Sequence, residues 1–292
     1  MIVSRTPSRG RLLIPRRQVI VWACTFGVGV LFLFAWELAS RAGTIDSVFY
    51  SKPTDIVVRL WQDMLGAEVY GRTIYEQIWI TTDAVLIGYV AGAAGGVLVG
   101  FAVGRSKWLS RALEPYILTF YAIPKISIAP LFILILGIGL ESKIAIVAME
   151  SFFILFMSTI RGVLEIDEQL VQIARIMGAS RRTVLGRILL PASLPAIFSG
   201  LQLAVPFAVI GAVLGEYIAS NRGLGWLVLY SGSSLDATGL FTAIVILVAL
   251  TWLLAQIVSR SVVAMAPWLP RNQERRNDSE PQVGDRGPEV VR

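Results

Sequence analysis

The stretch DEQLVQIARIMGASRRTVLGRILLP, residues 167–191, decides the fold, because two amphipathic patterns meet in it between two long apolar runs. The first pattern has the i, i+3, i+4, i+7 spacing of one helix face, at Leu170, Ile173, Ala174 and Met177. Gly178 breaks this helix, and Ser180 can cap a second one that Pro191 ends. The second helix has its apolar positions at Val184, Leu185, Ile188 and Leu189. Two such short helices cannot form their own core, so their apolar face must pack against a membrane bundle or inside another protein.

The composition outside this stretch is that of a membrane protein. Of the 292 residues, 55% are hydrophobic and 16% are charged, against about 25% charged in soluble domains. A bilayer core about 30 Å thick needs about 20 apolar residues in a helix. Six windows of that kind are present, at residues 19–36, 84–104, 115–140, 144–160, 192–215 and 237–259. We therefore expect an all-α membrane protein with six transmembrane helices.

The positive residues predict the orientation, because short loops rich in Lys and Arg stay in the cytoplasm. They collect in the N-terminal tail, in the loops after the second and fourth windows, and in the C-terminal segment. Both termini are therefore expected to be cytoplasmic. The first window is too long for the apolar part of a cleaved signal peptide, the alternative for that segment. Between the first two windows, Thr54 can cap an amphipathic helix that lies on the outer membrane surface.

The second window carries a stripe of glycines spaced four residues apart. Small residues allow two helix backbones to approach closely in lipid. Steps of four residues drift around a helix of 3.6 residues per turn, which suits either a right-handed crossing with one neighbour or contact with two neighbours in turn. We expect a helix-packing role for Gly88, Gly92, Gly96, Gly100 and Gly104.

Charged residues fall inside the predicted spans or at their edges: Lys125, Glu150 and Glu216, with Asp83 at the edge of one span. A charge near the bilayer centre costs about 2.5–3.5 kcal/mol on insertion scales, so each should face the bundle interior, water or a partner. Lys125 lies between Pro124 and Pro130, which predict a broken helix lining a cavity. Two interpretations remain open for Lys125: it attracts anions into a translocation path, or it forms a buried pair with Glu150 or Glu216.

Several classes of function are excluded by residue content. The chain has no histidine and only one cysteine, so Ser-His-Asp sites, histidine metal sites and an intramolecular disulfide are impossible. No lysine follows a glycine, so the sequence has no P-loop for a nucleotide. The helix, glycine turn and helix of residues 167–191 also resemble a DNA-binding helix-turn-helix. Both ends of that loop enter the bilayer, with no third helix between them, so we expect no nucleic-acid partner.

Residues 172–191 also resemble a family signature. The run Gln172-Ile173-Ala174, then Gly178, then Ile188-Leu189-Leu190-Pro191 is similar to the Glu-Ala-Ala signature of the permease subunits of binding-protein-dependent ABC importers. Gln172 replaces the usual Glu, and Ile173 replaces the first Ala. Further segments resemble the nitrate, sulfonate and taurine group of that family: Ala122-Ile123-Pro124-Lys125, Ala129-Pro130-Leu131-Phe132, Gly137-Ile138-Gly139, Gly215-Glu216 and Gly223-Leu224-Gly225-Trp226.

The resemblance implies a type I ABC importer permease in the bacterial inner membrane, without enzymatic activity of its own. Two permease copies would form the pore, with two ATPase subunits that hold ATP and Mg below it and a solute-binding protein outside. The solute would be a small anion such as a sulfonate, taurine or nitrate. The resemblance assigns coupling to the ATPase to Gln172, Ala174, Gly178, Ala179, Ser180, Arg181, Ile188, Leu190 and Pro191. An ATP-independent secondary transporter or channel is the alternative, but it leaves residues 167–191 without a role.

Under this interpretation the chain divides into five parts. They are a cytoplasmic N-tail (1–18), a first transmembrane helix (19–40), an external segment with the interfacial helix (41–80), a core permease domain of five transmembrane helices (81–267) and a disordered cytoplasmic C-tail (268–292). The core contains the coupling loop, residues 164–191.

Overall fold

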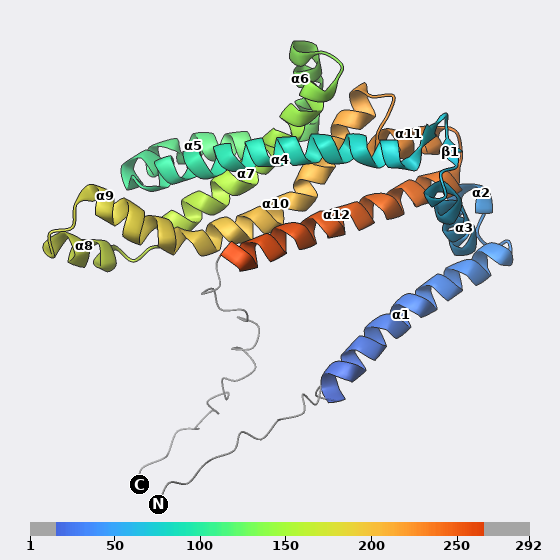
Figure 1. The fold of residues 1–292 in the computed structure, drawn as a ribbon, viewed down its shortest axis with the longest axis horizontal. Coiled ribbons are helices and arrows are strands. Elements are labelled where there is room, and N and C mark those ends of the chain that lie inside the picture. The colour runs from blue at the N-terminus through green and yellow to red at the C-terminus, as the bar shows by residue number, and fades with distance from the viewer. Residues whose placement is uncertain (1–15, 266–292) are drawn as a thin grey trace, which may run out of the picture. The chain divides into compact units, whose positions relative to one another are not determined.

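The structure, a computed structural model, describes residues 16–265, which are mostly helical (Figure 1). The predicted C-tail (268–292) and all but the last three residues of the predicted N-tail lie outside the described residues. The helices are α1 (Arg16–Arg41), α2 (Ser47–Tyr50), α3 (Pro53–Met64), α4 (Ile74–Gly104), α5 (Lys107–Ala122), the 3₁₀ turn η1 (Lys125–Ser127), α6 (Ala129–Leu136), α7 (Leu140–Leu164), α8 (Glu168–Ile176), α9 (Arg181–Val184), the π-helical turn η2 (Leu185–Leu189), α10 (Leu190–Ala219), α11 (Leu224–Ser233) and α12 (Ala237–Met265). Strands β1 (Glu68–Val69) and β2 (Arg72–Thr73) form an antiparallel hairpin.

Five helical segments of the described residues are long and apolar enough to cross a membrane. They are Ala23–Arg41, Ile74–Gly104, Leu140–Leu164, Arg181–Ala219 and Ala237–Met265. Each contains or largely overlaps one of the six predicted windows. The sequence therefore located these five segments, although the helices extend beyond the windows because polar and glycine residues at their ends remain helical.

The third predicted span, residues 115–140, is not a continuous helix. It is divided into the second half of α5, the turn η1 and the short helix α6. Ile123 is extended (φ −65°, ψ 127°), as expected before a proline, and Pro124 then directly precedes η1. Pro130 occupies the first turn of α6, where its missing N–H costs nothing. The predicted interruption between the two prolines is therefore present, and a single unbroken span is wrong for this segment.

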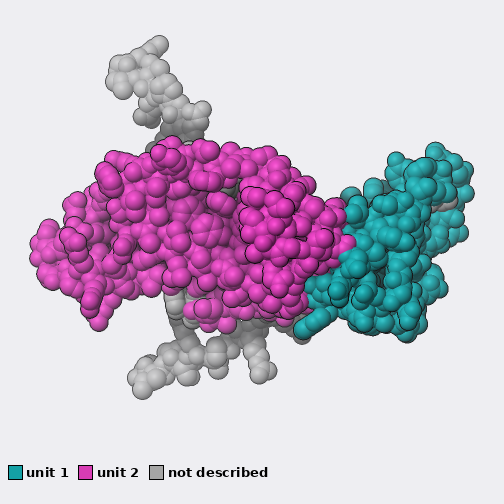
Figure 2. Space-filling model, turned by 90° about the horizontal axis from the view of Figure 1, so that it is seen from above, with its two compact units in different colours: residues 1–80, 221–247 teal, residues 81–220, 248–292 magenta. Residues whose placement is uncertain are grey.

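The described chain forms two compact units, coloured separately in Figure 2. Unit 1 comprises residues up to 80 together with 221–247, and unit 2 comprises residues 81–220 together with the segment from 248 onward.

In unit 1, the predicted amphipathic helix is α3, but Thr54 does not cap it. Pro53 starts the helix, and the N–H and hydroxyl of Thr54 donate to the carboxylate of Glu37 on α1 at 3.1 and 2.9 Å. A neighbouring helix thus supplies the acceptor that a cap would provide.

Unit 2 is built around α7. All five glycines of the α4 stripe face this one helix, so the alternative of two successive neighbours is wrong. A Cβ atom added at Gly96 would lie 2.6 Å from the carbonyl oxygen of Phe152, and one at Gly100 would lie 2.8 Å from that of Phe156. The contacts advance four residues at a time along both helices. The stripe therefore lets the two backbones touch, as predicted for helix packing in lipid.

Two adjacent glycines of α4 test this packing. We expect Gly96→Ala to lower the melting temperature of the detergent-solubilised protein, because the new methyl group meets backbone atoms of α7 and overpacking typically costs about 1–3 kcal/mol. The neighbouring Gly95→Ala is the control, since its Cβ would meet only the Phe152 ring at 3.4 Å. Equal melting temperatures for the two variants would contradict close packing through the stripe.

Candidate functional site

The loop between α7 and α10 folds as the two short helices that the sequence predicts. Asp167 caps α8 by accepting a hydrogen bond from the backbone N–H of Gln169 at 2.8 Å. After Met177 the chain turns at Gly178, whose φ of +82° strongly favours glycine. Ser180 then caps α9 by accepting from the N–H of Thr183 at 3.2 Å. We refer to Asp167–Val184 as the α8–α9 loop.

The second helix does not end at Pro191. From Arg181 to Ala219 the chain is helical without a break, through α9, η2 and α10. Within η2, the N–H of Leu190 donates to the carbonyl of Leu185, five residues earlier. Because of this π turn, the regular i→i−4 hydrogen bonds are already interrupted immediately before Pro191. The helix can therefore accommodate the proline, which has no N–H to donate to such a bond. The prediction that Pro191 terminates the helix is therefore wrong.

The residues assigned to coupling are divided between the exposed loop and the following helix. Gln172, Ser180 and Arg181 are exposed, whereas Ala174 and Ala179 are half-buried. Ile188, Leu190 and Pro191 lie in η2 and the first turn of α10, which places them outside the loop itself. The most exposed apolar side chains of the loop are those of Ile176 and Met177 at its tip, which are 85% and 82% exposed. An apolar tip of this kind is suited to insertion into another protein.

An ion pair that the sequence analysis did not identify fastens the loop to the rest of unit 2. Lys107, in the first turn of α5, pairs with Glu168 in the first turn of α8. Both side chains are about half exposed. Nothing in their sequence spacing relates them, because they lie 61 positions apart and become neighbours only through the packing of unit 2.

Lys125 forms an ion pair, which was one of the two interpretations that the sequence left open for it. Its Nζ lies 3.4 Å from Oε2 of Glu150 on α7, and 5.9 Å from the centre of the Phe153 ring. The lysine side chain retains 15% exposure, and the flanking Pro124 and Pro130 are exposed. The structure therefore joins Lys125 to Glu150 and not to Glu216.

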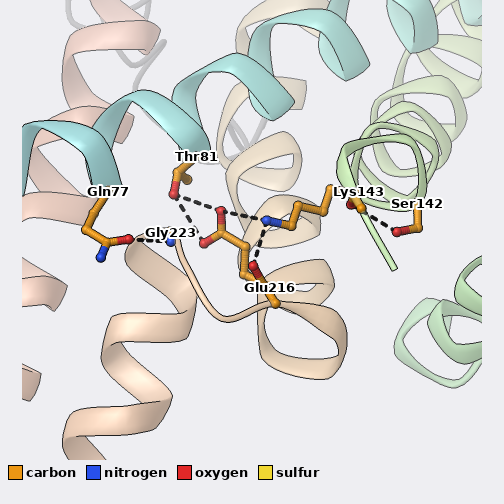
Figure 3. Close-up of polar contacts among 8 residues, drawn as sticks. Gln77, Thr81, Ser142, Lys143, Glu216 and Gly223 are labelled. Carbon is orange, nitrogen blue, oxygen red and sulfur yellow. Dashed lines mark hydrogen bonds and ion pairs between the residues drawn. The ribbon is translucent and has the colours of Figure 1, made fainter. Parts of the chain in front are cut away.

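Glu216 belongs to a second buried polar group, shown in Figure 3. The side chain of Glu216 on α10 is fully buried, and its Oε1 lies 4.0 Å from Nζ of Lys143 on α7. The hydroxyl of Thr81 on α4 donates to Oε1 at 2.9 Å, and Lys143 also donates to Ser220 at 2.8 Å. Lys143 falls between two of the predicted spans, outside the window 144–160, yet it is 5% exposed and lies within α7. The apolar window began one residue after it, so no sequence signal marked it as buried.

Unit 1 contains a polar and aromatic cluster that sequence reasoning also missed. The Tyr70 hydroxyl donates to Asp236 at 2.9 Å, and the Tyr70 ring packs on Tyr230, with 4.5 Å between ring centres. Burial, together with the hydrogen bond to Asp236, raises the pKa of Tyr70. In the same unit, the backbone N–H of Gly223 donates to Oε1 of Gln77 at 2.5 Å, which fixes the start of α11 to the start of α4.

A comparison with protein families gives a result consistent with this fold and with the α8–α9 loop. Residues 92–269 match the family described as the inner membrane component of binding-protein-dependent transport systems. The chain belongs to this family. The match extends from the glycine stripe of α4 to the segment after α12 and therefore includes the α8–α9 loop and both buried ion pairs.

Relatives of this importer permease carry names for several solutes. The chain is 25% identical to the putative aliphatic sulfonates transport permease SsuC of Bacillus subtilis, over 80% of this chain and 82% of that protein. It is 28% identical to the riboflavin transport permease RibX of Chloroflexus aurantiacus, over 80% and 87%. It is 26% identical to the taurine transport permease TauC of Escherichia coli, over 84% and 90%.

Among solved structures, an inward-facing form of the MetNI methionine ABC transporter is similar to this permease. The TM-score is 0.52 at 25% identity, with 72% of this chain and 95% of the other chain covered. The permease therefore has the type I ABC importer fold, which the resemblance implied. The family also establishes it as a multi-pass inner membrane component of an importer that works with a solute-binding protein.

The buried pair of Lys143 and Glu216 leads to a stability prediction. Lys143→Met removes the cation that lies 4.0 Å from Oε1 of the buried Glu216, and breaking a buried pair typically costs about 3–5 kcal/mol. We expect a large drop in the melting temperature in detergent, partly restored by adding Glu216→Gln. Lys107→Met is the control, because its exposed pair with Glu168 is of a kind worth about 1 kcal/mol or less. A Lys143→Met protein as stable as the control would show that the pair is unimportant.

Proposed function

We propose that the chain is the permease subunit that forms the solute path of an ATP-driven importer and couples it to a separate ATPase through the α8–α9 loop. The observation that carries the proposal is the loop itself, in a chain of this importer family. It has capped ends, a glycine turn and an exposed apolar tip, and it lies between two long apolar helices. A rigid element held at both ends by membrane helices can transmit the movement of a bound partner to them.

We further propose six passes with both termini in the cytoplasm. Five passes are the long apolar helices, and the sixth is made by α5 and α6 together. At 1.5 Å per residue these two helices supply about 24 and 12 Å of rise. The concentration of Lys and Arg in the N-terminal tail, the α4–α5 turn and the α8–α9 loop supports this orientation.

The proposed assembly has two copies of the permease, two ATPase subunits and an external solute-binding protein. ATP and Mg would be held on the ATPase, since this sequence has no Gly-Lys dipeptide for a P-loop. The names of SsuC and TauC support a small sulfonate-type anion as the solute. The name of RibX makes riboflavin a competing solute that the same assay must include.

Reconstitution tests this function. We expect vesicles containing the permease alone to take up no labelled taurine or alkanesulfonate. Uptake should appear when the partner ATPase and solute-binding protein of the importer are added together with ATP. Gly178→Leu should reduce this uptake at least tenfold, because leucine is strained at φ +82° and the turn at the tip is deformed. ATPase capture by the variant should fall in parallel.

Two controls make the result specific. Gly178→Asn should retain most of the activity, since asparagine tolerates positive φ better than other side chains. Gly186→Leu should insert and couple normally, because Gly186 has open space around it and no positive φ. Undiminished uptake driven by an ion gradient without ATPase would instead establish a secondary transporter.

The Lys125–Glu150 pair provides a test of the proposed path. If Lys125 also meets the anion, Lys125→Met with Glu150→Gln should assemble normally yet transport at least tenfold more slowly, since a charged hydrogen bond contributes about 1.5–3 kcal/mol. Lys125→Met alone should additionally reduce the amount of assembled complex, because Glu150 is left unpaired. The measurements are labelled uptake and the yield of permease–ATPase complex. Full uptake by the double variant would show that the pair is only structural.

A further inference from the structure

A hollow of about 580 Å³ lies in unit 2 beside the α8–α9 loop. Its walls come from the turn between α4 and α5, the end of α7, and the facing sides of α8, α9 and η2. Arg105, Arg175 and Arg181 line it from three of these elements. Val163, Val184 and Leu189 are among its apolar lining residues, and the first two are buried. The hollow therefore combines guanidinium groups with an apolar surface.

The charge of the hollow is not balanced within the described part of the chain. Lys107 and Glu168 also line it, but they are paired with each other. Among residues 16–265, no carboxylate forms an ion pair with Arg105, Arg175 or Arg181. Three guanidinium groups thus share one concave site with no anion of their own. A guanidinium pairs with a phosphate through two parallel hydrogen bonds, so a phosphate group suits this lining.

The position of the hollow along the helices identifies the source of the phosphate. It adjoins Gly104, the last residue of the apolar helix α4, and Leu164, the last residue of α7. Ends of membrane-spanning helices lie at the depth of lipid headgroups. Basic pockets between helices on the cytoplasmic side suit anionic headgroups, and the apolar lining suits the start of an acyl chain.

An acidic side chain of the ATPase is the rival occupant. The most exposed apolar residues of the loop, Ile176 and Met177, do not line the hollow. The apolar tip suited to a protein partner therefore lies outside the hollow, although Gln172 and Arg181 of the predicted coupling set line it, and the lining is adjacent to the ends of the spans. These observations favour lipid.

We propose that this hollow binds the phosphate of an anionic phospholipid, held by Arg105, Arg175 and Arg181 at the cytoplasmic surface. The bound headgroup would join the α4–α5 turn to α8 and α9, and so steady the loop in its docking position. The cytoplasmic location of this lipid site rests on the orientation proposed above. The binding itself does not depend on that orientation.

Native mass spectrometry of the permease–ATPase complex tests the proposal. The complex is released from nanodiscs of phosphatidylcholine with 30% phosphatidylglycerol, and the retained lipids are counted. We expect phosphatidylglycerol to be retained well above its share of the bilayer. Arg105→Gln with Arg175→Gln should reduce its retention at least tenfold, since each basic residue near an anionic surface contributes about fivefold.

The matched control is Arg182→Gln with Arg187→Gln, which removes the same charge from the same region at positions that do not line the hollow. We expect this control to retain the lipid as the wild type does. Equal losses in the two double variants, or no preference for phosphatidylglycerol in the wild type, would overturn the proposal. Displacement of the lipid by 10 mM inorganic phosphate would make it a site for free anions, which also contradicts the lipid assignment.

The same samples separate this inference from the proposed function. Both faces of a nanodisc carry the same lipids, so lipid retention does not depend on which face the loop occupies. Capture of the ATPase reports the proposed coupling independently. A wild-type complex that holds phosphatidylglycerol but shows no ATP-dependent uptake would refute the proposed function alone.

Discussion

Unit 2 depends on the close contact between α7 and the neighbouring helices that carry small residues. On one side, Gly96 and Gly100 of α4 bring backbone against backbone. On another, a Cβ added at Gly200 of α10 would lie 2.7 Å from that of Ser158, and one at Gly211 would lie 3.1 Å from the Cα of Val147. In lipid there is little hydrophobic gain from bringing helices together, so dispersion at such short range must hold them.

This packing explains where the charges of the spans lie. Because α7 is enclosed by its neighbours, Lys143 and Glu150 on it cannot reach water freely, and each requires a partner from another segment. Glu216 of α10 supplies one, and Lys125 of η1 supplies the other. The second pair requires η1 to approach α7, which an unbroken helix over residues 115–140 would not allow at the same place. The proline break and the ion pair are thus parts of one arrangement.

The sequence predicted what depends on local pattern. The long apolar helices, the glycine stripe, the Ser180 cap of the α8–α9 loop and the turn at Gly178 follow from periodicity and from the properties of single residues. Two of the features that it missed depend on tertiary neighbours. Glu37 replaces a Thr54 cap from 17 positions away, and Glu216 lies opposite Lys143, far from it in the sequence, so no pattern relates these partners. The third, the π turn that accommodates Pro191, is local, but no residue pattern distinguishes it from a regular helical turn.

Under the proposed coupling, the uninterrupted helix from Arg181 to Ala219 would give the loop a mechanical role that two separate helices would not have. Its N-terminal end adjoins the loop turn at Gly178, and near its other end Glu216 forms the buried contacts to Lys143 and Thr81. At 1.5 Å per residue its 39 residues have a contour length of almost 60 Å, with the π turn η2 and the interior prolines Pro195 and Pro206 along it. A partner that moves the loop would therefore act on one continuous helix, and the displacement would reach the buried Lys143–Glu216 pair, which joins α10 to α7. Such a pair has few intermediate arrangements, because separating its charges inside the protein is costly. Continuous movement at the loop would thereby be converted into a choice between two states of the bundle, which is what alternating access requires.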